Sequence, residues 1–184
     1  MALVATPDVQ ESFTAPDFSL TGIDGKTYTL NDVRGENGLV VMFICNHCPY
    51  VKGIMDRLPQ DMAALQARGI GVIAIMSNDT ADYPEDSFDN MRMFSLANSF
   101  SFPYVIDETQ EIARKYGAVC TPDFFGFDSN LNLKYRGRLD SNGKDPYTSD
   151  ARKELVEAMA EIASNGNYSG EQKPSMGCSI KWKN

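Results

Sequence analysis

The chain has 184 residues, with 17 Lys and Arg against 25 Asp and Glu and a formal net charge of −8. This length suits one domain with a full core. Nucleic acid is excluded as a partner, because phosphate binding needs clustered Lys and Arg and the chain has no basic block. The longest apolar run, residues 39–45, is too short to cross a bilayer, and residues 1–12 lack the pattern of a signal peptide. We therefore expect no membrane contact and a cytoplasmic location.

Strands and helices alternate along the chain. Alternating apolar and polar residues around an Asp-Gly turn predict an N-terminal β-hairpin over 13–30. Short runs of β-branched and aromatic residues predict further strands over 39–45, 72–76, 104–106, 124–127 and 134–138. Apolar residues spaced three or four apart predict helices over 51–65, 87–98, 109–116 and 150–163. This order of elements indicates an α/β sandwich with a mixed sheet.

The chain is predicted to form one domain with a C-terminal tail. No break in composition, repeat or low-complexity stretch divides the sequence. Residues 1–165, including the hairpin, are therefore assigned to the domain, and residues 166–184 to the tail. The tail carries Ile180 and Trp182, and free tails seldom carry large apolar side chains. We expect the tail to dock on the domain.

Two segments carry more specific expectations. Pro59 lies inside the helix predicted over 51–65 and should kink it, because proline has no N–H and clashes with the preceding turn. The loop and helix start over 79–89 are crowded with acidic residues. They are interpreted as a solvated face that complements a helix N-terminus, since their spacing fits no EF-hand.

The motif that carries chemistry is Cys45-Asn46-His47-Cys48-Pro49, between a buried strand and the start of a helix. Pro49 suits the first helical position, where its missing N–H costs nothing. The free N–H groups and the positive dipole end of that helix would favour thiolate over thiol, and a protonated His47 would add a second stabilising charge. Two intervening residues also let the Cβ atoms of Cys45 and Cys48 approach to about 4 Å, as a disulfide requires. The motif therefore predicts a redox-active pair.

These cysteines have two other interpretations. The pair could form half of a zinc site completed by Cys120 and Cys178, or by His47, but structural zinc normally uses two close-spaced ligand pairs and no second Cys-x-x-Cys follows. The two thiols could also be inert core groups, which their place at a helix start disfavours. In a chain without an export signal, redox chemistry is favoured, and no metal is expected.

Three segments of the chain together resemble a known family. They are CNHCPYVK after the buried strand, CTPDFFGFD further along, and PSMGCSIKWK near the end. The combination resembles the thioredoxin superfamily and is most similar to its peroxiredoxin-like group of redoxin-domain proteins, the alkyl hydroperoxide reductase and thiol-specific antioxidant type. The resemblance implies a thioredoxin-like three-layer α/β/α sandwich with a mixed central sheet and an N-terminal β-hairpin.

The resemblance also implies roles for five residues. Cys45 takes the place of the attacking thiol and Cys48 that of the resolving thiol. His47 lies where disulfide isomerases have the histidine that stabilises the attacking thiolate. Pro122 matches a cis-proline that faces the active site, so the Thr121–Pro122 bond is predicted to be cis. The backbone of Thr121 would then be free to pair with an extended substrate.

A thiol–disulfide oxidoreductase without a cofactor is the function that the resemblance implies, with protein or small-molecule disulfides as partners and the oligomeric state left open. Cys45 would attack a partner disulfide, and Cys48 would resolve the mixed disulfide. The first alternative is a thiol peroxidase, in which peroxide oxidises Cys48 and Cys45 resolves. Against it, Cys45 stands where peroxiredoxins have a threonine, and Pro122 where they have the arginine that holds the peroxide. A metal-binding module is the second alternative.

Two further cysteines, Cys120 and Cys178, are candidate relay thiols. Cys120 immediately precedes the Thr121–Pro122 loop, so it would lie near the redox pair if that loop faces the active site. Cys178 belongs to the tail that we expect to dock. Either thiol could pass electrons to a Cys45–Cys48 disulfide by exchange. The alternative is that Cys120 is a small buried hydrophobe and Cys178 a tail thiol.

Overall fold

A computed structural model of the chain describes residues 2–10 and 12–184. Within these residues, the larger of two β-sheets has seven strands in the order β3-β2-β6-β5-β4-β8-β9. The strands are Ser19–Gly22 (β2), Thr27–Thr29 (β3), Leu39–Phe43 (β4), Gly71–Met76 (β5), Tyr104–Ile106 (β6), Asp123–Phe127 (β8) and Leu133–Gly137 (β9). Strand β4 pairs in parallel with β5 and antiparallel with β8. The sheet is therefore mixed, as predicted.

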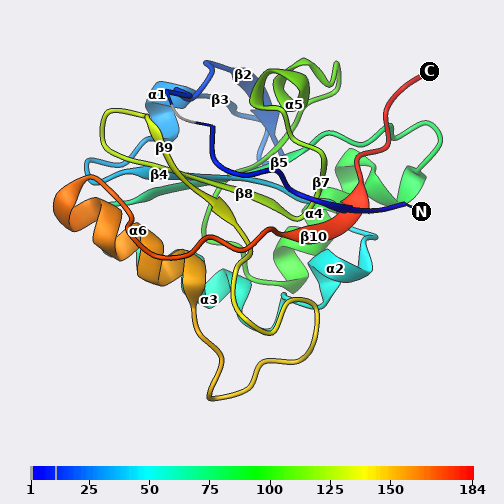
Figure 1. Cartoon of the computed structure of the whole chain (residues 1–184). Coiled ribbons are helices and arrows are strands. Elements are labelled where there is room, and N and C mark those ends of the chain that lie inside the picture. Colours follow the sequence, from blue (N-terminus) through cyan, green and yellow to red (C-terminus); the bar gives the residue numbers. More distant parts are fainter. Residues whose placement is uncertain (1, 11) are drawn as a thin grey trace.

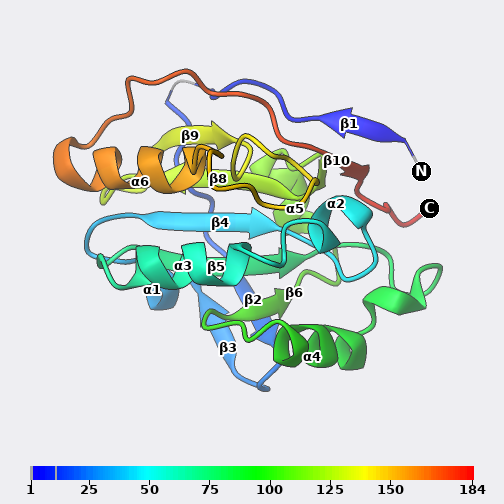
Figure 2. The ribbon, with the colours of Figure 1, turned by 90° about the horizontal axis from the view of Figure 1, so that it is seen from below.

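Helices cover both faces of this sheet (Figures 1 and 2). One face carries α2 (Pro49–Lys52), α3 (Leu58–Gln66), α4 (Phe88–Ala97) and α6 (Glu154–Asn165), and the other carries α1 (Leu30–Val33) and α5 (Glu111–Tyr116). Along β4, Val40 and Met42 pack in the core of the first face, and Val41 and Phe43 in the core of the second. A strand buried on both faces needs this unbroken apolar run. The predicted three-layer sandwich is confirmed.

A second, smaller sheet joins the two ends of the chain. Within the described residues its strands are β1 (Leu3–Ala5), β10 (Met176–Ser179) and β7 (Cys120–Thr121), in the order β1-β10-β7. Both pairings are antiparallel, and the two termini lie on the same side of the molecule (Figure 1). Beyond β10, Ile180 is buried, whereas Trp182 is partly exposed and stacks on Arg114. The tail therefore lies against the strand that precedes Pro122.

The prediction of one kinked helix over 51–65 is wrong. Helix α2 ends at Lys52, and α3 begins at Leu58 with Pro59 in its first turn. At that position proline costs no backbone hydrogen bond. The segment therefore contains two separate helices, α2 and α3, instead of one kinked helix. Helices α4, α5 and α6 and the large-sheet strands lie within a few residues of their predicted ranges, whereas α1 was not predicted. No helix of the described residues is long and apolar enough to span a membrane.

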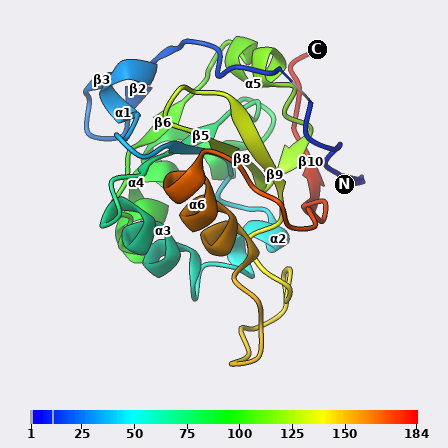
Figure 3. The ribbon, with the colours of Figure 1, turned by 60° about the vertical axis from the view of Figure 1, so that its left-hand side comes forward.

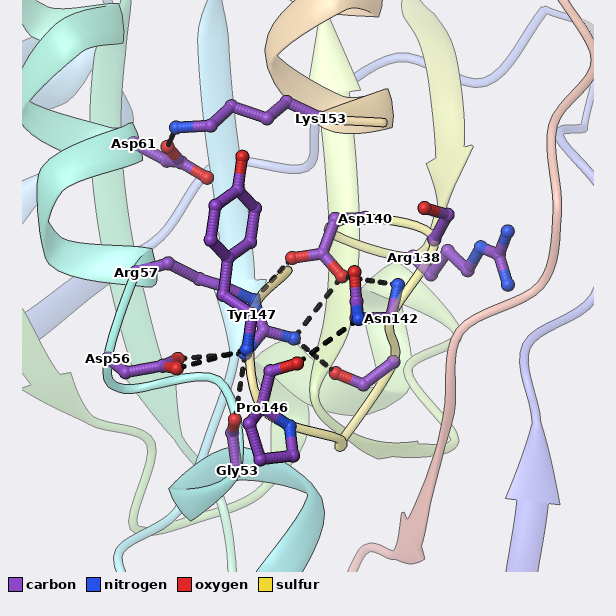
Figure 4. A network of polar contacts seen from close by, with 12 residues as sticks. Gly53, Asp56, Arg57, Asp61, Arg138, Asp140, Asn142, Pro146, Tyr147 and Lys153 are labelled. Carbon is purple, nitrogen blue, oxygen red and sulfur yellow. Dashed lines mark hydrogen bonds and ion pairs between the residues drawn. The ribbon is translucent and has the colours of Figure 1, made fainter. Parts of the chain in front are cut away.

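The segment between β9 and α6 projects from the domain (Figure 3) and is anchored at the break between α2 and α3 (Figure 4). There the buried Arg57 pairs with Asp140 and donates to the carbonyl oxygen of Gly53 at 2.9 Å. At the start of α6, Lys153 pairs with Asp61 of α3 at 2.6 Å. These ion pairs fix the projecting segment beside α2.

Candidate active site

The Cys-x-x-Cys motif lies where β4 ends and α2 begins. Cys48 is the N-cap of α2 and Pro49 is its first residue, as the helix-start pattern predicts. All four cysteines are free thiols. Cys45 is 1% exposed and Cys48 is 0% exposed, so a bulky partner has no access to the pair in this conformation.

Thr121 contacts both sulfurs of the pair. The Oγ1 atom of Thr121 lies 3.3 Å from Cys45 Sγ, and its carbonyl oxygen lies 3.2 Å from Cys48 Sγ. The Thr121–Pro122 bond is cis, as predicted. However, Thr121 already pairs with Cys178 of β10. The expectation that its backbone is free for an extended substrate is wrong for this conformation, because the tail occupies that edge.

A buried carboxylate that the sequence did not single out, Asp86, completes the site. It ends the 3-10 helix η1 (Pro84–Asp86) and is 0% exposed. It accepts hydrogen bonds from the backbone N–H of Asn46 at 2.8 Å and from the side-chain amide of Asn78 at 2.8 Å. The interpretation of residues 79–89 as a solvated face is therefore wrong at Asp86, and also at Asp79, which is buried. No local pattern could have found it, because Asn46 lies 40 residues earlier in the chain.

His47 pairs with this carboxylate. Its Nδ1 atom lies 2.7 Å from Asp86 Oδ2, and its ring stacks on Tyr83 with the ring centroids 5.7 Å apart. The structure thus brings His47 to the redox pair, as predicted, but with Asp86 as its hydrogen-bond partner. A positive charge on His47 would act on Cys45 partly by offsetting the charge of Asp86.

The two thiols of the pair have opposite acidities. The pKa of Cys48 is lowered to about 4, first because the Cys45 thiol donates to its sulfur, and further by hydrogen bonds from Cys178 and Thr121, against the opposing effect of burial. The pKa of Cys45 is raised well above its ordinary value by the same hydrogen bond, by burial and by the charge of Asp86. The directions of the two pKa shifts favour the negative charge on Cys48 and the proton on Cys45. The family resemblance implies Cys45 as the attacking thiolate, and that assignment stays a prediction.

Cys120 and Cys178 lie on different sides of β7 and β10. Cys178 stands opposite Thr121, whose carbonyl oxygen lies 3.2 Å from Cys48 Sγ, and it packs in the same core cluster as Cys48. The Cys120 thiol instead lies 3.6 Å from the carbonyl oxygen of Pro122, and burial raises its pKa. The structure therefore brings Cys178, but not the Cys120 thiol, into contact with the pair.

Three side chains of the site have the spacing of metal ligands. Among residues 2–10 and 12–184, one such group is present, and its ligand atoms on Cys45, His47 and Asp86 lie within 4.8 Å of one another. A bound ion would have to replace the hydrogen bond between His47 and Asp86. The zinc arrangement considered from the sequence, with Cys120 and Cys178 as further ligands, is not assembled within these residues.

A cavity of about 210 Å³ lies beside strand β10. It is bordered by Tyr50 of α2, by Pro122 and Phe124, by Lys144 of the projecting segment and by Met176 of β10. The cavity is therefore lined by Tyr50 from the helix that follows Cys48, by the cis-proline Pro122 and by Met176 of the tail. A partner bound next to the redox pair would contact this apolar space.

Residues 13–136 match the AhpC/TSA family. The chain belongs to this family. The predicted resemblance to peroxiredoxin-like redoxin proteins is thereby confirmed.

Solved structures extend the comparison. An uncharacterized conserved protein from Geobacillus kaustophilus is 41% identical with a TM-score of 0.91, and the match covers 100% of this chain and 97% of that one. The thioredoxin domain of a thiol-disulfide oxidoreductase from Bacteroides vulgatus is 14% identical with a TM-score of 0.58, over 70% of this chain and 89% of that one. The second likeness concerns the fold alone and confirms that this AhpC/TSA family member has the predicted thioredoxin-like fold.

A curated relative carries a functional name. The thiol-disulfide oxidoreductase ResA of Geobacillus thermodenitrificans is 26% identical over 121 residues, which are 66% of this chain. The match spans 65% of that relative's length. Family and relative agree with the predicted class of enzyme, an oxidoreductase.

Proposed function

We propose that this protein is a thiol–disulfide oxidoreductase whose redox couple is Cys45 and Cys48. The observation that carries the proposal is a pair of buried free thiols at a helix start, both in contact with the residue before a cis-proline. The lowered pKa of Cys48 supports it. The relative named as a thiol-disulfide oxidoreductase supports the same class. Protein or small-molecule disulfides are the partners that such a couple reduces.

The reduced site can donate two electrons in two exchange steps. In the first step, the Cys48 thiolate attacks one sulfur of a partner disulfide, and the other partner sulfur leaves as a thiolate. In the second step, Cys45 attacks Cys48 Sγ and its proton passes to the carboxylate of Asp86, which lies within 4.8 Å of Cys45 Sγ. The second partner sulfur leaves, takes up that proton, and the Cys45–Cys48 disulfide forms. Compared with the order expected from the family resemblance, attacking and resolving thiols are exchanged.

A thiol peroxidase is the second candidate function. A Cys48 thiolate followed by Pro49 in a member of the AhpC/TSA family is the observation that favours it. Peroxide would oxidise Cys48 to a sulfenic acid, which Cys45 would resolve with loss of water. Pro122 still stands where an arginine would hold the peroxide. We therefore propose disulfides as the primary partners.

The test uses two variants of the couple, Cys45→Ser and Cys48→Ser, with Cys120→Ser as the matched control for loss of a buried thiol. Reduced protein is mixed with insulin, a protein disulfide, and separately with hydrogen peroxide. The two rates are compared, and the modified cysteines are mapped by mass spectrometry. Cys48→Ser should lose at least about 100-fold in rate, as removal of a nucleophile does. Cys45→Ser should still be modified at Cys48 but should form no Cys45–Cys48 disulfide, and Cys120→Ser should keep the parent rate.

Two results would contradict the proposal. Faster oxidation by peroxide than by insulin, with a sulfenic acid trapped on Cys48, would assign the protein to the peroxidases. Stoichiometric metal in the protein purified without added ion, lost in Cys45→Ser, would favour a metal-binding module.

A further inference from the structure

Strand β10 lies where an extended substrate would bind. In the pairing of β10 with β7, Cys178 stands opposite Thr121 and Ser179 stands opposite Cys120. Strand β1 closes the other edge, with Leu3 opposite Cys178. Both ribbon views place β10 next to β1, at the end of the molecule that carries α2 (Figures 1 and 2). The tail therefore fills the edge beside the cis-proline that strand-type recognition of a peptide would use.

The register of β10 brings Cys178 to Cys48. The carbonyl oxygen of Thr121 lies 3.2 Å from Cys48 Sγ, and Thr121 is the residue opposite Cys178. Strand β10 also packs against α2, the helix whose N-cap is Cys48. All three thiols, those of Cys45, Cys48 and Cys178, pack in one core cluster. Cys48 thus has two neighbouring thiols, Cys45 from the motif and Cys178 from the tail.

We propose that Cys178 is a second resolving thiol, which forms an intramolecular disulfide with Cys48 when a partner disulfide is reduced. The inference rests on the proposed function and adds a third redox residue to it. Cys178 attacks Cys48 Sγ in the mixed disulfide, and the bond between Cys48 and the partner sulfur breaks. The partner sulfur leaves as a thiolate and takes up the proton that Cys178 loses. Two protein thiols are oxidised and one partner disulfide is reduced, so no further oxidant is needed.

The same strand couples this chemistry to release of the partner. Cys45 and Cys48 are buried beneath the docked tail, so a partner reaches Cys48 when β10 leaves Thr121. The return of β10 re-forms the pairing with β7 at the edge that a bound peptide would use, and it delivers Cys178 to the mixed disulfide. Cys45 can then displace Cys178 from Cys48 by a further exchange, which leaves the Cys45–Cys48 disulfide and a free Cys178 thiol.

Cys120 provides the matched control. It belongs to the same small sheet and is as buried as Cys48. Its thiol contacts the carbonyl oxygen of Pro122, and it is not among the hydrogen-bond partners of Cys48. Loss of the Cys120 thiol should therefore leave resolution of a Cys48 mixed disulfide unchanged.

The experiment removes the first resolving thiol with Cys45→Ser. One equivalent of 5,5′-dithiobis(2-nitrobenzoate) is added to the reduced protein, and the coloured thiolate that it releases is measured. Attack by Cys48 releases one equivalent, and resolution of the adduct releases a second. We expect two equivalents from Cys45→Ser and from Cys45→Ser/Cys120→Ser, with a Cys48–Cys178 linked peptide in the digest. We expect one equivalent from Cys45→Ser/Cys178→Ser, with the adduct retained on Cys48.

Each other outcome is decisive. One equivalent from all three proteins, with the adduct retained on Cys48, would overturn the inference and leave the proposed function standing. Absence of both an adduct on Cys48 and a Cys48–Cys178 linked peptide would overturn the proposed function and the inference with it. The Cys48–Cys178 linked peptide is sought in Cys45→Ser, in which Cys178 is unchanged. Its presence or absence therefore tests the inference even if Cys178→Ser loosens β10.

Discussion

At the scale of single residues, Asp86 sets the balance of charge in the site. Its carboxylate is fully buried and raises the pKa of Cys45, and His47 contacts it at 2.7 Å. The strand over 39–44 has no acidic residue, and the fold instead supplies one from η1. His47 and Asp86 therefore act on Cys45 in opposite directions, with His47 as a positioning residue that acts partly through the carboxylate.

Two substitutions separate these effects. Asp86→Asn keeps the shape of the side chain and removes its charge, so the pKa of Cys45 should fall. His47→Ala should raise that pKa, because the charge of Asp86 is then uncompensated. Both are measured by pH titration of the ultraviolet absorbance of the thiolate in the Cys48→Ser background, which leaves one thiol in the couple. Shifts of the same sign in the two variants would refute this charge balance.

Local sequence patterns predicted part of the site. Cys45, His47 and Cys48 belong to one short motif, whose chemistry follows from its place between a strand and a helix. Asp86 could not be derived in this way, and Cys178 was indicated only by the expected docking of the tail. Asp86 lies 39 residues from His47, and Cys178 meets Cys48 only through the pairing of β10 with β7. Contacts of this kind depend on the tertiary structure, which no local period encodes.

At the scale of elements, the large sheet follows from the sequence and the small sheet does not. Strands β4 and β5 are continuous apolar runs of five and six residues, which is a strong signal. Strands β1, β7 and β10 have three, two and four residues, too few for an alternation of apolar and polar residues to show. Their pairing also joins opposite ends of the chain. Only the apolar residues of the tail indicated that it docks.

Gly177 controls how closely β10 approaches β7. A Cβ atom at this position would collide with the carbonyl oxygen of Thr121, so Gly177→Ala should push the strand away from Thr121. Overpacking of this kind costs about 1–3 kcal/mol, so Cys48 should become accessible roughly tenfold more often or more. The measurement is the rate at which iodoacetamide alkylates Cys48. Ser179→Ala, in the same strand, is the control and should react at the parent rate; an unchanged rate in Gly177→Ala would show that β10 does not cover Cys48.

At the scale of the whole molecule, the site exists only when distant parts of the chain have come together. The motif follows β4, Asp86 comes from η1, Thr121 from β7 and Cys178 from β10, and both termini lie at this end of the molecule (Figure 1). The hydrogen bonds that hold Cys48 as a thiolate are therefore lost on unfolding. The protonation of Cys48 and the stability of the reduced protein are linked for this reason.

This linkage predicts how stability depends on pH. Folding lowers the pKa of Cys48 from 9.0 to about 4, and a lowered pKa gives stability that is complete above the unfolded value and is lost as the pH falls through the folded value. The difference in unfolding free energy between the reduced parent and Cys48→Ser should thus shrink from pH 8 towards pH 4, by up to about 1.4 kcal/mol per pH unit. The raised pKa values of Cys45 and Cys178 destabilise the fold only at higher pH. They therefore do not change the unfolding free energy between pH 4 and pH 8. Thermal unfolding of both reduced proteins across the range measures the difference, and a gap in Tm that does not change with pH would show that Cys48 is not a thiolate in the folded protein.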